Sequence, residues 1–560
     1  MNERQVKRER VVFLTVLALA AFSCLAAEEL PQRLFRERWQ ERLPDRAVPE
    51  VRYELDPSLS GDEVRVCVKG GKAVVSAGRK RGLVLGAGCL LKAIRWRENG
   101  FDLADGEYGV RPAKSLRMAY LARHFRNWYM EAPAREVCRY IEDLALDGIN
   151  AFSFQFSLAE VDQARETPEF VRTFEATSRQ MLATVNDLDC DFCDWAGGNQ
   201  LSEDAPEEFR AVPSVGYGRS QLGFNACPAK PGALKAMLEM RRKNVARLNG
   251  ARVGGLIYWP YDEGGCGCTN CHPWGANGYV GLIERLHDFY VAACPSAKHI
   301  VSTWMFDRQD YDGFWNYLSR QDWIDYVLCD AHGDFPRYPL EHPLPGRTKL
   351  VTFPEISMYG RFPWGGYGAI ALPRRFERLF RQVEKVADGF VCYSEGIFED
   401  VNKAVVTRLY LDPKTAPEEI VRKYARYHLA GTDPSDFVRL VDLMEANHLG
   451  VEFSSDRAKD ARRLAERMDA SILPSLRTSW RWRLLYVRAL FDAALAETPG
   501  FDPVSIGPHS DVAKPEGVRP FVEELARLYH AERQAEAVKA GKSKGWTCPR
   551  MHGGHEWKNQ

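Results

Sequence analysis

The chain has 560 residues, more than a single hydrophobic core usually holds, so we expect roughly two to four domains. Its hydrophobic content of 45% and charged content of 27% are typical of a globular protein. Lysine plus arginine and aspartate plus glutamate both number 76. The resulting net charge of zero argues against a nucleic-acid-binding protein, because such proteins usually carry a basic excess.

The first residues have the pattern of a cleaved export signal. A basic segment, Lys7–Arg10, precedes an apolar run, Val11–Ala21, and small residues follow up to Ala27. Because the run is too short to span a membrane comfortably, we expect residues 1–27 to be removed and the protein to be secreted or periplasmic, with no membrane span. A lipoprotein anchor at Cys24 is the less favoured alternative, since the preceding residues form a poor lipobox.

Residues 47–105 are expected to form a small α/β domain. Apolar alternation and a glycine turn predict three strands, over residues 51–55, 64–68 and 73–76. Gly82–Ile94 predicts a loop that leads into a buried helix. Within this region, Arg81–Leu91 has the pattern RGLxxGxxxLL, which resembles the domain preceding the barrel in family 20 hexosaminidases and family 67 α-glucuronidases. The resemblance implies that a glycoside hydrolase barrel follows.

Between residues 112 and 410, short apolar runs alternate with amphipathic stretches of helical period. The runs predict eight strands, over Leu116–Leu121, Ile149–Phe156, Leu188–Phe192, Val253–Tyr258, His299–Met305, Trp323–Leu328, Lys349–Phe353 and Gly389–Tyr393. Eight strand–helix units in roughly 250–300 residues predict an α/β fold of the (β/α)8 barrel (TIM barrel) type. A doubly wound open sheet is the competing fold, but no G-x-G-x-x-G follows the first strand.

Acidic residues follow several of the predicted strands, where the active site of a barrel lies. Glycoside hydrolysis needs one carboxylic acid to protonate the leaving oxygen and a second carboxylate to activate water or attack the anomeric carbon. Glu263, after strand four, is the predicted acid, because the apolar strand before it would keep a glutamate protonated. Asp330 and Glu355, after strands six and seven, are the candidate bases, and Asp194 follows strand three. Any one of these acids has an alternative role as a helix cap.

This arrangement resembles family 67 α-glucuronidases, in which the acid follows strand four and the bases follow strands six and seven. The resemblance implies an inverting mechanism for Glu263, Asp330 and Glu355. The pair Asp262-Glu263 is also similar to family 20, in which the aspartate orients the substrate acetamido group and the glutamate is the acid. The two resemblances differ about Asp262, and they leave a uronic-acid and an N-acetylhexosamine substrate both open.

Further polar and aromatic residues near the predicted strand ends are candidate substrate contacts. The set is His124, Trp195, Trp304, His332, Trp364 and Glu395. The histidines would bind hydroxyl or carboxylate groups, and the tryptophans would stack on a sugar face. A purely structural role for the histidines and a core position for the tryptophans are equally consistent with the sequence.

A cysteine motif, C-x-C-x-x-C, directly follows the predicted acid and is typical of a metal knuckle or of tight disulfide bonding. Three thiolates need a fourth ligand for tetrahedral zinc. Cys227 in the loop after strand three is the favoured fourth ligand, ahead of Cys193 and His272. The predicted structural zinc ligands are therefore Cys227, Cys266, Cys268 and Cys271. Disulfides are the alternative, since an exported protein permits them.

Residues 411–540 are mostly helical and charged in pattern and predict a helical C-terminal domain, which also resembles family 67; residues 541–560 predict a flexible tail. The expected function is that of a secreted glycoside hydrolase acting on an oligosaccharide or polysaccharide, with no cofactor required for catalysis. A non-catalytic carbohydrate-binding barrel and a metal-dependent hydrolase that uses the cysteine cluster are the alternatives.

Overall fold

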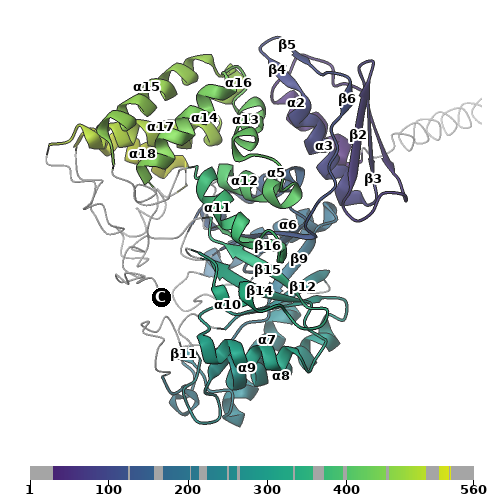
Figure 1. Ribbon diagram of the computed structural model, residues 1–560, viewed down its shortest axis with the longest axis vertical. Coiled ribbons are helices and arrows are strands. Elements are labelled where there is room, and N and C mark those ends of the chain that lie inside the picture. Colours follow the sequence, from purple (N-terminus) through teal and green to yellow (C-terminus); the bar gives the residue numbers. More distant parts are fainter. Residues whose placement is uncertain are drawn as a thin grey trace, which may run out of the picture.

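The computed structural model describes residues 29–123, 127–156, 168–201, 204–213, 224–248, 251–260, 265–331, 334–356, 371–394, 400–448, 453–499, 516–528 and 530. These residues form an N-terminal sheet with two helices, a barrel, and a group of C-terminal helices (Figure 1). Figure 1 shows the N-terminal sheet and the C-terminal helices on one side of the barrel, with α5 and α12 between them and the barrel strands.

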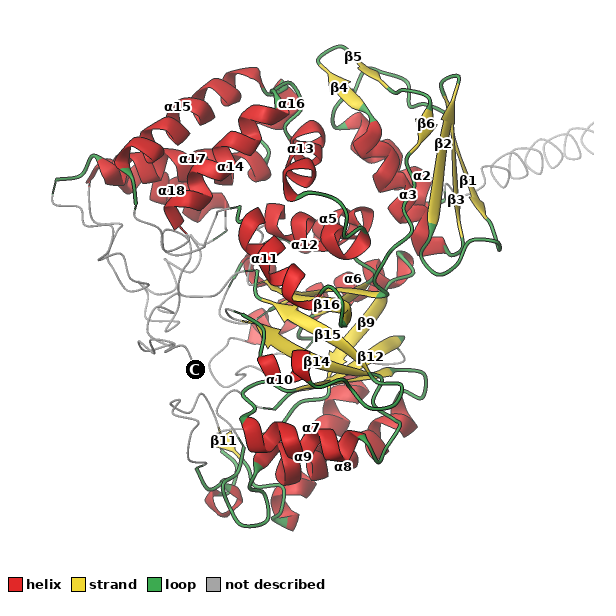
Figure 2. Ribbon diagram, viewed as in Figure 1, coloured by secondary structure: helices red, strands yellow, loops and turns green. Residues whose placement is uncertain are grey.

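The N-terminal part is a four-stranded sheet in the order β1-β3-β2-β6. The strands are β1 (Val51–Leu55), β2 (Val64–Lys69), β3 (Lys72–Ala77) and β6 (Gly106–Glu107). The two helices of this part are α2 (Leu30–Gln40) and α3 (Lys80–Ala93), and a separate hairpin of β4 (Arg95–Arg97) and β5 (Gly100–Asp102) lies between α3 and β6 in the chain. Figure 2 shows α2 and α3 beside this sheet. The alternation in β2 buries Val64, Val66 and Val68, because successive side chains of a strand point to opposite faces.

The glycine-rich segment predicted as a loop is helical from Lys80 onward. Its glycines serve close packing instead of a turn. A Cβ atom on Gly86 would lie 2.3 Å from Val75 Cγ1 of the sheet, and one on Gly88 would lie 1.8 Å from the carbonyl oxygen of Leu146 in α5. The glycines therefore let α3 lie directly against the sheet on one side and against a barrel helix on the other.

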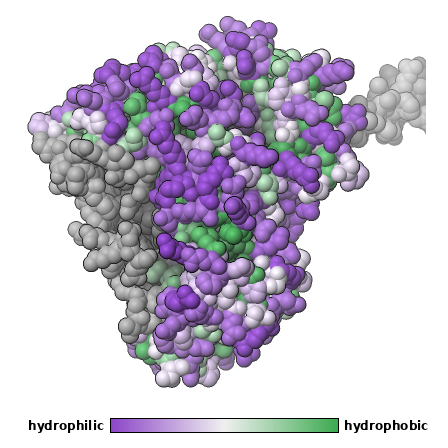
Figure 3. Space-filling model, viewed as in Figure 1, coloured by the Kyte–Doolittle hydropathy of each residue, from purple (hydrophilic) through white to green (hydrophobic). Residues whose placement is uncertain are grey.

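The predicted (β/α)8 barrel is confirmed: eight parallel strands close in the order β12-β13-β14-β15-β16-β7-β8-β9. The strands are β7 (Leu116–Leu121), β8 (Ala151–Ser153), β9 (Asp191–Trp195), β12 (Val253–Tyr258), β13 (Lys298–Ser302), β14 (Tyr326–Ala331), β15 (Lys349–Pro354) and β16 (Ala387–Ser394). The helices that follow them are α5 (Ala134–Asp147), α6 (Pro168–Asp187), α7 (Pro231–Leu248), α8 (Tyr279–Ala293), α9 (Arg308–Leu318), α10 (Arg337–Glu341), α11 (Pro373–Val383) and α12 (Asp400–Leu411). Seen from the same side as in Figure 1, the surface of the molecule is largely hydrophilic, and hydrophobic residues gather near its middle, in the region of β15 and β16 (Figure 3).

The third barrel strand begins later than its apolar run predicted. Leu188 and Cys190 are buried, but the chain there is only leaving α6, and Asp189 has a left-handed conformation with φ 56°. Pairing with β8 starts at Asp191, opposite Ala151. The sequence predicted a strand at these positions because the buried apolar residues of a short turn have the same local pattern as a short buried strand.

The C-terminal part consists of helices that pack on one another. They are α13 (Pro417–His428), α14 (Pro434–His448), α15 (Ser455–Ser471), α16 (Pro474–Arg477), α17 (Trp480–Ala496) and α18 (Arg519–Leu528). Their core includes the fully buried Trp482 of α17. Within the described ranges, none of the helices is both long enough and apolar enough to cross a lipid bilayer.

Ionic contacts join the three parts of the chain. Arg38 of α2 donates two hydrogen bonds to Asp143 of α5, at 2.8 and 3.1 Å. Arg481 of α17 donates to Asp143 at 2.9 Å and to Asp400 of α12 at 2.8 Å. We call Arg38, Asp143, Asp400 and Arg481 the junction network. Burial alone would raise the pKa of Asp143, but Arg38 and Arg481 lower it to about 2.

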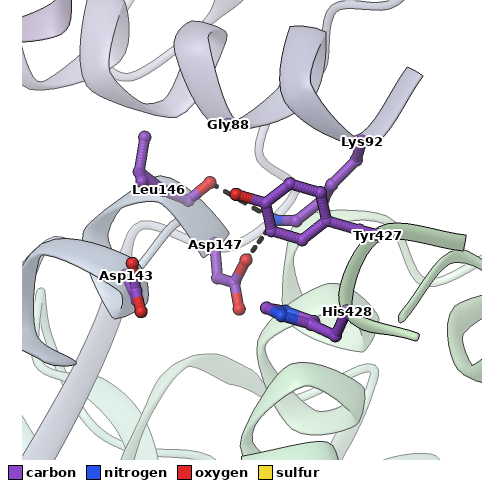
Figure 4. A pocket seen from close by; sticks show the side chains of 7 residues that line it. All are labelled: Gly88, Lys92, Asp143, Leu146, Asp147, Tyr427 and His428. Carbon is purple, nitrogen blue, oxygen red and sulfur yellow. Dashed lines mark hydrogen bonds and ion pairs between the residues drawn. The ribbon is translucent and has the colours of Figure 1, made fainter. Parts of the chain in front are cut away.

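A small cavity lies beside the junction network, and Figure 4 shows its lining. Lys92 of α3 forms an ion pair there with Asp147 at the end of α5. Burial raises the pKa of Asp147 despite this cation. His428 of α13 also lines the cavity, and burial together with Arg481 lowers its pKa, which keeps the imidazole neutral.

A second ionic contact ties the N-terminal sheet to the first barrel strand. Arg117 of β7 is 1% exposed and donates to Asp62 at 2.7 Å. Arg81 of α3 and Asn150 also donate to Asp62, each at 2.7 Å. Burial would raise the pKa of Asp62, but the two arginines lower it to about 2. The buried guanidinium of the barrel is thus neutralised by a carboxylate of the N-terminal part.

Candidate active site

The inner face of the barrel is built from alternate residues of each strand. A cluster of buried apolar residues fills the interior and draws on all eight strands, with Met118, Tyr120, Ala122, Ala151, Cys193, Ile257, Ile300, Leu328, Val351, Phe353 and Val391 as its members. Because side chains alternate along a strand, residues two positions beyond these members also face inward. This alternation of inward-facing and outward-facing residues decides which strand-end residues line the C-terminal mouth of the barrel, where barrel active sites lie.

Six aromatic residues form a continuous layer across the C-terminal end of the interior, which we call the aromatic layer: Tyr120, Trp195, Trp259, Trp304, Phe353 and Tyr393. Ring centroids lie 4.7 Å apart for Tyr120–Trp195 and 5.3 Å apart for Tyr120–Tyr393. Trp259 stacks on Trp304 with centroids 5.4 Å apart and an interplanar angle of 28°. Aromatic faces of this kind suit the apolar faces of sugar rings.

Two of the predicted site residues, Trp195 and Trp304, belong to this layer. Trp304 is 4% exposed and Trp195 is half-buried. The other four members are not among the residues predicted from the sequence. The signal that would have found them is the alternation itself, because Tyr120, Phe353 and Tyr393 each stand two residues beyond an inward-facing apolar residue.

Asp330 and Glu355 both occupy inward-facing positions at the C-terminal ends of neighbouring strands. Asp330 lies in β14 two residues after Leu328, and Glu355 follows β15 two residues after Phe353. Their register partners are aromatic: Asp330 pairs with Phe353, and Glu355 forms an isolated parallel bridge with Tyr393. Glu355 is 7% exposed and Asp330 is half-buried. The two candidate bases are therefore placed on the same side of the barrel, beside the aromatic layer.

Six further predicted residues lie outside the described part of the chain: His124, Asp262, Glu263, His332, Trp364 and Glu395. Each follows a barrel strand that the structure does describe. Their roles remain predictions from the sequence.

Asp194 points the opposite way from the other strand-end acids. It lies one residue after the inward-facing Cys193, so its side chain faces the surrounding helices, where it is 2% exposed. Burial raises the pKa of Asp194 to about 6, against the opposing effects of a backbone hydrogen bond from Trp195 and of the Arg241 guanidinium. Asp194 therefore follows strand three as the sequence predicted but does not face the mouth of the barrel, because it stands one residue out of step with the inward-facing positions of its strand.

Gln155, after strand two, holds a member of the aromatic layer in place. Its side-chain nitrogen donates to the Tyr120 hydroxyl, and its side-chain oxygen accepts from the Arg123 backbone amide at 2.7 Å. The Arg123 guanidinium is fully buried and donates to the Tyr129 carbonyl at 3.2 Å and to Ser178. Arg123 therefore supports the wall of the barrel from behind, and Gln155 orients Tyr120.

The structure brings together the four cysteines predicted as metal ligands. The sulfur atoms of Cys227, Cys266, Cys268 and Cys271 all lie within 4.8 Å of one another. Cys193, a runner-up ligand, lies instead inside the barrel. A hydrogen bond from Cys271 lowers the pKa of Cys266 to about 4, and the same contact raises the pKa of Cys271.

The sequence matches no protein-family model, and no curated protein matches it either. Solved structures match in fold. A family 89 glycoside hydrolase from Clostridium perfringens, in complex with its substrate GlcNAc-alpha-1,4-galactose, superposes with a TM-score of 0.61 at 11% identity, covering 89% of this chain and 64% of that one. The chain therefore spans less than two thirds of the length of that enzyme.

Two further solved structures share the fold. A family 115 4-O-methyl-alpha-glucuronidase with specificity for decorated arabinogalactans gives a TM-score of 0.56 at 10% identity, covering 94% of this chain and 77% of that one. A family 138 enzyme that targets pectin rhamnogalacturonan II gives 0.53 at 10% identity, covering 89% and 71%. Identities this low show a shared fold with glycoside hydrolases. The expected relation to families 67 and 20 in particular is not confirmed.

Proposed function

We propose that this protein is a glycoside hydrolase that cleaves its substrate with carboxyl groups at the C-terminal end of the barrel. The observation that carries the proposal is the placement of Asp330 and Glu355 at inward-facing ends of two neighbouring strands, beside the aromatic layer. A non-catalytic barrel would gain nothing from two acids at this end, because neighbouring carboxylates repel each other. The shared fold with several glycoside hydrolase families supports the same activity.

In this mechanism Glu263 is the general acid and Asp330 or Glu355 is the base or nucleophile. Glu263 follows β12 by five residues, and the last inward-facing residue before it in the described chain is Trp259. An apolar environment disfavours the charged form of a carboxyl group, and in this proposal it maintains the proton that the leaving group needs. Asp262 beside it is the candidate residue for orienting a substrate substituent.

The proposed substrate is a glycan that contains a uronic acid or an N-acetylhexosamine. The family 89 structure holds a GlcNAc disaccharide and the family 115 enzyme is a glucuronidase, so the shared fold accommodates both classes of sugar. A secreted or periplasmic location is part of the proposal and rests on residues 1–27. N-terminal sequencing of the exported protein should begin near Glu28; retention of the leader would contradict it.

The test is a screen of the full chain against chromogenic glycosides and polysaccharide-derived oligomers, followed by Glu263→Gln on the best substrate. We expect turnover to fall about 10²–10⁴-fold, the range that general acid catalysis supplies, while the circular dichroism spectrum is unchanged. The matched control is Asp388→Asn, an acid near the opposite end of β16 that pairs with Lys349 at 3.4 Å. It should keep full activity.

Two results would overturn parts of this proposal. Full activity of Glu263→Gln would remove that residue from the role of acid. Binding of oligosaccharides by the wild-type chain with no hydrolysis of any of them would favour a non-catalytic carbohydrate-binding barrel.

A further inference from the structure

Four thiols from two separate loops converge beside the barrel. Cys227 follows β11 (Phe224–Asn225) in the connection from β9, and the other three follow β12. Because β9 and β12 are hydrogen-bonded neighbours in the barrel, their following loops lie side by side. Cys227, Cys266 and Cys271 are at most 2% exposed, and Cys268 is half-buried.

The spacing of the sulfur atoms matches a tetrahedron around one metal ion. Cys227 Sγ lies 3.8 Å from Cys268 Sγ and 3.8 Å from Cys271 Sγ, and no pair in the group of four exceeds 4.8 Å. With zinc–sulfur bonds of about 2.3 Å, the sulfurs of a regular tetrahedron lie about 3.8 Å apart. A disulfide needs a sulfur–sulfur distance of about 2.05 Å, and all four residues are free cysteines in the structure.

The same loops are tied to each other and to the protein behind them. The amide of Gly267 donates to the Val212 carbonyl at 2.8 Å, and the amides of Cys271 and His272 both donate to the Cys268 carbonyl at 3.0 Å. A Cβ atom on Gly265 would lie 1.8 Å from the indole of the buried Trp274, so this backbone is pressed flat against the ring. The ligands are therefore held in place by contacts that do not depend on an ion.

We propose that Cys227, Cys266, Cys268 and Cys271 bind one Zn²⁺ ion, which joins the loop after β9 to the loop after β12. A set of four thiolates fills the tetrahedral shell, so the ion has no open position for substrate and its role is structural. The ion fixes the chain from Gly265 onward, immediately after the segment that carries Glu263. This inference does not depend on the proposed glycosidase activity, because its test measures metal content.

The experiment is elemental analysis of the full chain, purified without added metal and dialysed. We expect about one zinc per chain, released when a thiol-blocking reagent is added to unfolded protein. Replacement by Co²⁺ should give the intense visible absorption of a tetrahedral tetrathiolate complex. Cys268→Ser, at the most exposed ligand, should lower zinc affinity at least tenfold. Cys138→Ser in α5 is the matched control, a half-buried cysteine outside the cluster, and should retain one zinc.

Three results would overturn the inference. Less than a tenth of a zinc ion per wild-type chain, with all four thiols open to alkylation in folded protein, would show free cysteines. A disulfide between any two of the four, found by peptide mapping, would show covalent pairing instead. Stoichiometric iron in place of zinc would show an iron–sulfur site. The wild-type measurements decide among these even if Cys268→Ser fails to fold.

Discussion

Buried and half-buried carboxylates occur both in the junction network and at the C-terminal end of the barrel, and their surroundings differ. Asp143 and Asp400 receive hydrogen bonds from Arg481, and Asp143 also from Arg38. At the barrel end, Asp330 and Glu355 stand in register with aromatic residues. A guanidinium partner favours the charged form of an acid and fixes its position. The second pair lies instead at the end of the barrel where active sites are built, and we propose that it serves the reaction while the first pair stabilises the fold.

The largest expected effect is on activity at the barrel end. Glu355→Gln and Asp330→Asn keep the size of each side chain but remove its charge. Turnover of the substrate found in the screen should fall about 10²–10⁴-fold for whichever residue is the base. The denaturant midpoint should change little or rise, because a neutral amide is less costly at a crowded acidic mouth. Loss of stability with unchanged turnover would make these acids structural and end the contrast.

The next effect is on stability at the junction. Arg481→Met leaves Asp143 with Arg38 and the more distant Arg139, and leaves Asp400 without its arginine. Because a carboxylate that loses its buried partner is strongly destabilising, we expect a loss of about 3 kcal/mol in denaturant unfolding. The control is Arg462→Met, which breaks an exposed pair with Glu466 and should cost at most about 0.5 kcal/mol. Equal effects of the two variants would show that the junction network adds nothing beyond a surface pair.

The smallest effect concerns pH. The pKa of Asp143 is about 2 in the folded protein and about 3.9 in an unfolded chain. A lowered folded pKa gives stability that is fully present above the unfolded value and is lost as the pH falls toward the folded one. Unfolding midpoints of the wild type and of Asp143→Asn should therefore differ most above about pH 5, by about 2 kcal/mol in free energy, and converge toward pH 2. A constant difference over this range would contradict the assignment.

Much of the barrel was readable from sequence because its strands are buried on both faces and appear as apolar runs. Leu116–Leu121 and Val253–Tyr258 were predicted with the bounds that the structure gives. The strand at Asp191–Trp195 was displaced, because its first residue is polar and the apolar residues before it belong to a turn. Strand boundaries depend on pairing partners far away in the chain, which local patterns do not contain.

The candidate site was readable only in part. Asp330 and Glu355 were found because they end apolar runs, and Cys227 because its loop follows the neighbouring strand. The outward direction of Asp194 was missed, because it depends on a one-residue difference in register. The junction network could not be inferred at all, since Arg38 and Asp143 are 105 positions apart and nothing in either local pattern signals the other.

The contact between Arg117 and Asp62 bears on the design of truncated versions of this protein. A shortened chain that starts at the first barrel strand would contain all eight strands and every candidate catalytic residue. It would also contain a guanidinium that is 1% exposed in the intact protein, with the carboxylate that neutralises it removed. The barrel on its own would therefore contain a buried positive charge without its partner, so the N-terminal sheet should be kept as a structural part of the barrel.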